Sequence, residues 1–409
     1  VLVAALISIA AGCARSAPPV PSQSFGLDNL TNATPSLASR GNLVVLSWTT
    51  SELDGSQANV FAAVSEDGGR TFRAPVRVND RVGTARNSGE QAPRIAIGQD
   101  VIALVWSARH DGQSQIVFSR STDGGRTFSA ARAAHPAGLT GLRGWASAAY
   151  DRDNRLHVLW LDGRNAPPAA PHVHGAHAMP SASEGGAPIQ DLFHAVVDGS
   201  IAVDRLAVAN VCFCCKTSVT PRPDGSVVAL WRHIFPESTR DIGATILGAS
   251  SPAATVTRVG EDNWQIAACP DDGPAAVVAE DGSMHAVWPT AVSNRAKGIF
   301  YASAKDAITY GERQRVDGGE AAGASHPQIA LLDSETIAVV WDEALGDENR
   351  VMVRRRDIGS GTWSAAEALP DSQDGIYPVA AAADGAMLVA WTNRGTTPSK
   401  IALARLPAR

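Results

Sequence analysis

Residues 94–106 read RIAIGQDVIALVW, two strand-like runs joined by a short polar turn. The run from Arg94 to Gly98 alternates, which is typical of a strand with one covered face, and Val101 to Trp106 is almost wholly apolar, which is typical of a strand covered on both faces. A third run follows at Ile116 to Ser121, and a short outer strand is expected near Phe128. The stretch therefore predicts a sheet of four strands.

The same apolar run ending in tryptophan occurs seven times, at spacings of 50 to 71 residues. The tryptophans are Trp48, Trp106, Trp160, Trp231, Trp288, Trp341 and Trp391. A repeat of this length, built of short strands, cannot bury both of its own faces and must stack on its neighbours around an axis. We therefore predict an all-β chain that forms a β-propeller of seven four-stranded blades. Six blades with an additional element are the alternative.

The seventh repeat reaches Arg409 with only three predicted strands. A ring with one incomplete blade would leave an exposed sheet edge, and propellers avoid such edges by closing the ring. We therefore expect the segment around Phe25 to Leu30 to supply the missing strand. Residues 25–409 then form a single propeller domain.

Composition excludes one class of partner. The chain has 409 residues, 35 basic and 41 acidic side chains, and a formal net charge of −6. This balance provides no cationic stripe for a polyanion, so no nucleic-acid partner is expected.

The first twelve residues are apolar and end in Ala10-Ala11-Gly12-Cys13. They are too short to cross a membrane, which takes about 20 residues. The segment resembles a bacterial lipoprotein signal, with residues 1–13 as the signal and Cys13 as the lipid attachment site. Residues 14–24 then form a Ser/Pro-rich tether. This resemblance implies a periplasmic protein, held at the outer membrane through its lipid alone.

Two octapeptides, SEDGGRTF at 65–72 and STDGGRTF at 121–128, share one pattern. They resemble the Asp box of sialidases and other BNR-repeat propellers. In each, the aspartate can accept backbone N–H bonds across a turn that the glycines allow. Asp67, Gly69, Asp123 and Gly125 are therefore assigned a structural role, and residues 355–363 carry a degraded copy.

Four of the five cysteines form an unusual pattern. Cys212, Cys214 and Cys215 occur together in the loop that enters the fourth inner strand. Cys269 stands 19 residues before Trp288, just as Cys212 stands 19 residues before Trp231. Equivalent positions of adjacent blades are neighbours in space, so the four thiols are expected to lie close together and to be able to chelate a metal.

Histidines gather on the same predicted face. An insertion at 165–190 contains His172, His174, His177 and Met179, and it leaves the third blade beside the fourth. His233 and His326 are expected to face the same mouth. Thiolate, imidazole and thioether are the ligands that copper(I) prefers, with zinc as the alternative metal.

Each cluster also has a structural interpretation. In an oxidising compartment four cysteines can form disulfides, for instance between Cys212 or Cys214 and Cys269. The adjacent Cys214 and Cys215 are poorly placed for two ordinary bridges, so a vicinal disulfide or a redox-active thiol stays open. The His-rich insertion, taken alone, can be a loop without function.

Resemblance to sialidase-like propellers implies a second activity. Sialidases hold a carboxylate with arginines and use a tyrosine nucleophile polarised by a glutamate. Arg94 and Tyr377 are the positions that match part of this set, and no glutamate partner is evident. The Cys212 to Cys215 segment also resembles a C-x-C-C subgroup of secreted bacterial sialidase-like proteins, in which the thiols replace glycosidase chemistry.

Three functions follow from these patterns. The first is an envelope protein that holds a copper ion as a carrier, scavenger or sensor. The second is a sialidase-like glycosidase acting on an acidic sugar. The third is a platform that binds a glycan or another envelope protein and uses its cysteines only as staples.

Overall fold

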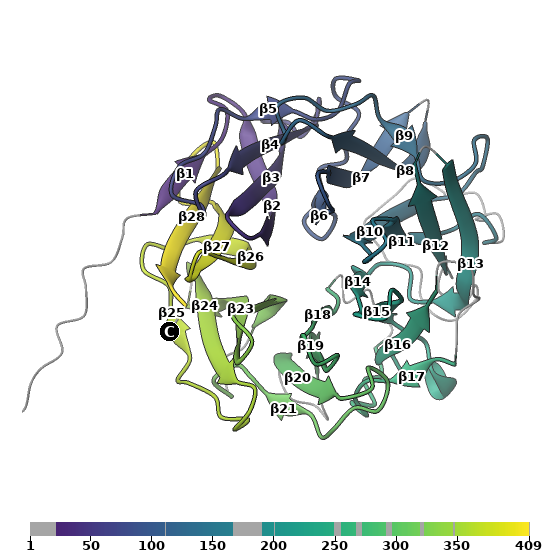
Figure 1. The fold of residues 1–409 in the computed structure, drawn as a ribbon, viewed down its shortest axis with the longest axis vertical. Coiled ribbons are helices and arrows are strands. Elements are labelled where there is room, and N and C mark those ends of the chain that lie inside the picture. Colours follow the sequence, from purple (N-terminus) through teal and green to yellow (C-terminus); the bar gives the residue numbers. More distant parts are fainter. Residues whose placement is uncertain are drawn as a thin grey trace, which may run out of the picture.

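The computed structural model describes residues 22–110, 112–166, 190–199, 201–248, 255–266, 272–291, 297–319, 323–346 and 348–408. These residues form seven four-stranded antiparallel sheets arranged as blades around an axis, as predicted (Figure 1). The only helical element in this part of the chain is the short 3-10 turn η1 (Pro236–Ser238). No helix among the described residues is long and apolar enough to cross a membrane.

The second strand of each blade is the most completely buried, and the inner strand precedes it along the chain. The inner strands are β2 (Thr31–Arg40), β6 (Arg94–Ile97), β10 (Arg143–Tyr150), β14 (Ser218–Pro221), β18 (Ala275–Val278), β22 (Ser325–Leu331) and β26 (Gly375–Ala383). The second strands are β3 (Leu43–Ser51), β7 (Ile102–His110), β11 (Leu156–Asp162), β15 (Val227–Arg232), β19 (Met284–Thr290), β23 (Thr336–Leu345) and β27 (Ala386–Asn393). Every repeat tryptophan lies in a second strand and is buried, because this strand is covered by a blade on each side.

The outer half of most blades is shorter, because most of the outermost strands have only two or three residues. The third strands are β4 (Asn59–Ser65), β8 (Gln113–Ser121), β12 (Gln190–Asp198), β16 (Ile242–Leu247), β20 (Gly298–Ala304), β24 (Glu348–Asp357) and β28 (Lys400–Pro407). The outermost strands are β5 (Val76–Arg77), β9 (Arg132–Ala133), β13 (Ile201–Val211), β17 (Thr257–Arg258), β21 (Gln314–Arg315), β25 (Glu367–Ala368) and β1 (Gln23–Phe25). The outer strand expected near Phe128 is β9, a few residues further along.

The N-terminal strand closes the ring, as predicted. β1 pairs antiparallel with β28, with Gln23 opposite Leu403 and Phe25 opposite Ile401. The strand lies slightly earlier than expected, because the chain turns after Phe25 at Gly26. The Phe25 ring contacts the rings of Trp48 and Phe72 in the first blade, so the closing strand also bridges two blades.

Four inner strands contain the same irregularity. β2, β10, β22 and β26 each shift register once. At that place one residue has a left-handed φ of 53° to 55°, and these residues are Thr34, Trp145, His326 and Tyr377. A bulge of this kind redirects a side chain out of the regular ladder. In these four blades the inner strand therefore directs one side chain out of the regular ladder.

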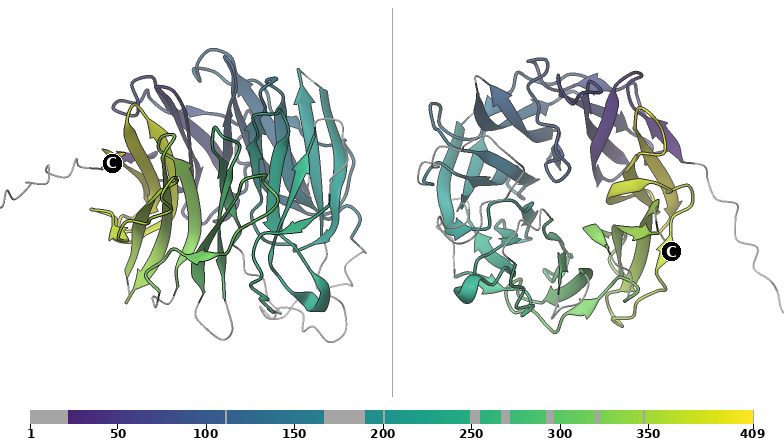
Figure 2. Two further views of the ribbon diagram at one scale, coloured as in Figure 1. Left: turned by 60° about the horizontal axis from the view of Figure 1, so that its bottom comes forward. Right: turned by 180° about the vertical axis from the view of Figure 1, so that it is seen from behind.

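The up-and-down order of the strands defines two faces. Loops that enter the inner strands, and loops between second and third strands, lie on one face, here the upper face. Turns that join the first to the second strand, and the third to the fourth, lie on the lower face. Figure 2 shows the blades around the ring from two further directions.

Candidate metal and thiol site

Three cysteines lie together between β13 and β14, on the upper face. Cys212, Cys214 and Cys215 are all buried, and their Sγ atoms lie within 4.8 Å of one another. They pack against Trp145 and Ile234. A group of three cysteine sulfur atoms at these distances could hold a metal ion. The prediction that these three residues lie close together is thus met.

Cys212 is the anionic member of the cluster. Its Sγ lies 3.9 Å from Cys215 Sγ and accepts a hydrogen bond of 3.2 Å from Arg240 Nη1. The Cys215 thiol, and then the positive charges of Arg240 and Arg232, lower the Cys212 pKa to about 6 despite burial. Cys212 is therefore mostly a thiolate at neutral pH, which is the form that binds metals and attacks disulfides.

Cys215 is the protonated member. Burial, followed by its hydrogen bond to Cys212, raises the Cys215 pKa well above the usual thiol value. Cys212 and Cys215 thus form a thiolate–thiol pair that shares one proton. The two residues have a C-x-x-C spacing in the sequence. The pair is free of disulfide bonding.

Cys214 is in a different chemical state, because it is disulfide-bonded. Its bond is with neither Cys212 nor Cys215, since both are free. Several predicted sites lie outside the described residues. They are the predicted lipid attachment site Cys13 and the predicted metal ligands His172, His174, His177, Met179 and Cys269. Their roles stay predictions.

His233 is tied to its own blade. Its Nδ1 accepts a hydrogen bond of 3.2 Å from Trp231 Nε1, and its ring lies edge-on to Phe235. Burial lowers the His233 pKa to about 4, so the ring is neutral. Asp162 and Glu343 accept hydrogen bonds from Trp160 and Trp341 in the same way, two residues after each tryptophan. The polar residues two positions after these three tryptophans thus have a structural role.

A second group of polar residues, the central charged cluster, lies next to the thiols. It consists of Glu90, Lys216, Asp272, His326 and Asp342, all on the upper face. Lys216 Nζ lies 4.0 Å from Glu90 Oε2 and 3.8 Å from Asp272 Oδ1, and donates to the Pro327 carbonyl at 3.1 Å. Because Lys216 directly follows Cys215, the thiols and the cluster share one peptide.

His326 belongs to this cluster and not to the thiol group. Its Nδ1 lies 2.6 Å from Asp342 Oδ2, and its Nε2 lies 3.4 Å from Glu90 Oε1. Burial would lower the His326 pKa, but Asp342, Glu90 and Asp272 raise it to about 9, so the imidazole is a cation. Burial raises the Glu90 pKa to about 7. In this arrangement both nitrogens of His326 face carboxylates.

Arg94 and Tyr377, the two positions of the glycosidase hypothesis, line one small cavity with Glu90 and His326. The cavity has a volume of about 20 Å³. Arg94 donates to the backbone carbonyls of Ala146 and Glu90. The Tyr377 ring lies 4.1 Å from the ring of His326. Glu90 is thus a carboxylate that lines the same cavity as these two residues.

Sequence reasoning missed Glu90, Lys216 and Asp272. A usable signal exists in the repeat, because Lys216 stands 15 residues before Trp231 just as His326 stands 15 before Trp341. Aligning the repeats on their tryptophans therefore places Lys216 and His326 at equivalent positions of their blades. Their mutual contacts cross the axis, however, and blade 2 meets blades 4 and 6 only once the ring is closed.

The Asp boxes lie on the lower face, away from this site. Asp67 Oδ1 accepts the backbone N–H groups of Arg70 and Thr71 at 3.0 and 2.9 Å, and Asp123 makes the equivalent bonds in the second box. The degraded copy has a similar turn at Asp357. A further turn of this kind, unforeseen from the sequence, centres on Asp306, which accepts the backbone N–H of Thr309.

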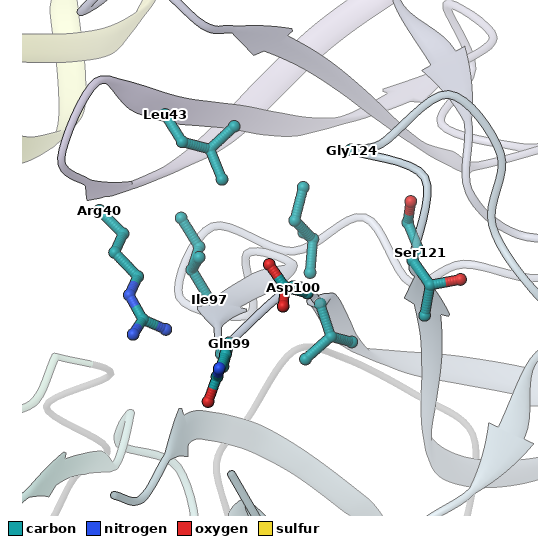
Figure 3. Close-up of a pocket in the computed structure, with 11 residues that line it drawn as sticks. Arg40, Leu43, Ile97, Gln99, Asp100, Ser121 and Gly124 are labelled. Atoms are coloured by element: carbon teal, nitrogen blue, oxygen red, sulfur yellow. The ribbon is translucent and has the colours of Figure 1, made fainter.

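A lower-face cavity of about 450 Å³ opens between the first two blades. Figure 3 shows Arg40 on one side of it and Ser121 on the other, with Ile97 between them. Its lining comes from the hairpins of two blades and the second Asp box. No sequence-predicted ligand lies in it.

Comparisons with known proteins identify the fold. No protein-family model and no curated protein sequence matches the chain. Among solved structures, the phage phi92 endosialidase matches with a TM-score of 0.52 and 10% sequence identity. The match covers 95% of this chain and 69% of the endosialidase chain. A protein of unknown function from Dyadobacter fermentans matches with a TM-score of 0.50 and 15% sequence identity. The match covers 81% of this chain and 95% of that protein.

A Hadza microbial sialidase also has a TM-score of 0.50, at 13% identity over 76% of this chain. The match spans 63% of that sialidase's length. Sequence identities this low establish a shared architecture and leave activity to be argued from the site. The chain is therefore structurally similar to sialidase-like β-propellers.

Proposed function

We propose that this chain is a copper(I)-binding propeller of the bacterial envelope, which holds the ion through Cys212 and Cys215 and acts as a carrier, scavenger or sensor. The observation that carries the proposal is the buried free thiol pair, 3.9 Å apart, beside two arginines. Two metal–sulfur bonds of about 2.3 Å each span such a separation with a bent S–metal–S angle.

Charge favours a monovalent ion. Copper(I) with two thiolates carries one net negative charge, which Arg240 and Arg232 can balance. Zinc normally takes four protein ligands in a structural site, and among the described residues only the three cysteines form a ligand group. Because Cys214 is disulfide-bonded, two thiols remain, which suits soft copper(I) better than zinc.

The wider setting of the proposal rests on the sequence. The resemblance of residues 1–13 to a lipoprotein signal supports attachment at the outer membrane through Cys13. The His172 to Met179 segment supports a role in delivering copper to the thiols. The C-x-C-C resemblance supports a function distinct from that of sialidases.

The test is copper stoichiometry and affinity. Protein from Ala14 onward, purified without oxygen, is titrated with copper(I) against a chromophoric copper(I) chelator, and bound metal is counted by elemental mass spectrometry. We expect about one tightly held ion per chain in the wild type and in His233→Gln. We expect its loss in Cys212→Ser and Cys215→Ser.

The variants also separate the alternatives. Retention in Cys214→Ser would define a two-thiol site, whereas loss would add Cys214 to the ligands. Circular dichroism confirms that each variant is folded. Unchanged copper binding in folded Cys212→Ser would overturn the proposal, and tighter binding of zinc than of copper would overturn the choice of metal.

Glycoside hydrolysis is a second candidate, because Arg94, Tyr377 and Glu90 converge on one cavity. At about 20 Å³ this cavity is sized for a single water molecule and not for a sugar. We therefore expect no turnover of a fluorogenic sialoside. Turnover that falls in Tyr377→Phe would instead establish the enzyme.

A further inference from the structure

The cysteine cluster combines the two ingredients of disulfide exchange. Exchange requires a thiolate next to a disulfide sulfur, with an approach through which the new bond can form. Here Cys212 is free and Cys214 is disulfide-bonded. Their Sγ atoms are no more than 4.8 Å apart, and Cys215 supplies a second free thiol at 3.9 Å from Cys212.

The attacking sulfur is identified by its hydrogen bonds. Arg240 Nη1 donates to Cys212 Sγ at 3.2 Å, and Arg240 is itself buried. Arg232 is also buried, and it is held in place by the carbonyls of Arg240 and Pro289 at 2.8 and 2.7 Å. Two fixed cations beside one sulfur stabilise its anionic form, which is the environment of reactive cysteines.

We propose that Cys212, Cys214 and Cys215 form an intramolecular thiol–disulfide exchange unit, in which the disulfide of Cys214 passes to Cys212 and then to the Cys212–Cys215 pair. In the first step the Cys212 sulfur anion attacks Cys214 Sγ. A Cys212–Cys214 bond forms, the original bond of Cys214 breaks, and its electron pair leaves on the former partner sulfur.

In the second step Cys215 gives its proton to the released sulfur and attacks Cys212. The Cys212–Cys215 bond forms, and Cys214 leaves as a thiolate. One disulfide and two free sulfurs are present before and after, together with one proton, so the sequence needs no outside oxidant or reductant.

The exchange is independent of any metal, but it has a consequence for the proposed copper site. A disulfide held on Cys214 leaves the Cys212–Cys215 pair open to a metal. A disulfide held on Cys212 and Cys215 consumes that pair. If the proposed function is right, the position of one disulfide therefore decides whether the site can bind copper, and bound copper keeps the disulfide on Cys214.

Disulfide mapping tests the exchange without metal. Protein is incubated with a chelator at pH 8, quenched in acid to stop exchange, alkylated in denaturant and digested with chymotrypsin. Cleavage after Phe213 separates Cys212 from Cys214 and Cys215, so a disulfide of Cys212 joins two peptides that otherwise part. Tandem mass spectrometry then assigns each bond.

We expect the wild type to contain a fraction of Cys212–Cys214 or Cys212–Cys215 bonds besides the original bond of Cys214. Cys215→Ser should stop at Cys212–Cys214, and Cys212→Ser should keep the original bond alone. Arg240→Met should reach the same products several-fold more slowly, whereas Arg240→Lys should be closer to the wild type.

One result overturns the proposal. If the folded wild type shows a single disulfide of Cys214 after days of incubation, with Cys212 and Cys215 fully alkylated, no exchange takes place. Copper binding measured on the same preparation separates the two ideas: binding with no exchange leaves the metal proposal intact, and exchange with no binding leaves the exchange intact.

Discussion

The charge state of His326 at the upper face is controlled by carboxylates from its own blade and from another one. His326 comes from the sixth blade, while the two carboxylates that face it, Glu90 and Asp342, come from the second and the sixth. An ordinary histidine would be neutral at pH 8. His326 stays a cation there because the negative charges of Asp342, Glu90 and Asp272 favour its protonated form.

This arrangement makes stability depend on pH. The folded-state pKa of His326 is raised to about 9 and that of Glu90 to about 7. A raised pKa means that the folded state binds protons more tightly than the unfolded state. The stability from His326 is complete below its unfolded pKa of about 6.5 and is lost as pH rises toward 9.

We therefore expect the stability that His326 contributes, measured as the difference in unfolding free energy between the wild type and His326→Gln, to fall between about pH 6.5 and 9. Urea denaturation of both proteins at several pH values measures it, with His110→Gln as a control at a half-buried histidine of the second blade. A pH dependence of the unfolding free energy that is unchanged in His326→Gln would contradict the assignment of the charge.

Two glycines show how far an Asp-box turn depends on its packing against the neighbouring blade. Gly125 in the second Asp box has a φ of +79°, and an added Cβ would lie 2.6 Å from Val64 Cγ2 in the first blade. Gly138 has nearly the same φ of +77°, with no atom within 4 Å of the added Cβ. The two glycines separate backbone strain from inter-blade packing.

We expect Gly138→Ala to cost about 1 kcal/mol through left-handed backbone strain alone. Gly125→Ala should cost about 2 to 4 kcal/mol, because overpacking against Val64 adds to that strain. Chemical denaturation of both variants provides the measurement. Equal losses would mean that the Asp-box turn moves away from the first blade at no cost.

The whole molecule is held closed by a short element. β1 has three residues, yet it completes the seventh blade, and the Phe25 ring lies 5.0 Å from Phe72 and 6.3 Å from Trp48. We expect Phe25→Ala to lower the unfolding free energy by about 2 kcal/mol, less than for a fully buried phenylalanine. Leu53→Ala, at a side chain that is 69% exposed, should be nearly neutral. Similar denaturation midpoints for the two variants would show that closure does not depend on this ring.

The fold could be predicted from the sequence because its determinants are local and repeated. Each tryptophan marks one buried second strand, and counting strands in the last repeat predicts closure. The thiol cluster could be predicted for a related reason, since Cys212 to Cys215 are neighbours in sequence and share one loop. The disulfide state of Cys214 could not, because several pairings satisfy the same spacing.

The central charged cluster was beyond prediction for a geometric reason. Contacts such as Lys216 to Glu90 and His326 to Glu90 depend on how near the blades come at the axis. That distance is a property of the closed ring, and no segment of the sequence encodes it alone. His326 was accordingly expected among the copper ligands, whereas it lies in an ion pair with Asp342.

The seam between β28 and β1 has a practical consequence for engineering. These strands are antiparallel neighbours, with Leu403 opposite Gln23, and so they resemble the two arms of a hairpin that lacks its connecting turn. Linking them covalently would make the seventh blade topologically equivalent to the others. New termini could then be placed at an exposed turn such as the one at Gly138, between β9 and β10, giving a circularly permuted protein in which every blade is built from one continuous stretch of chain.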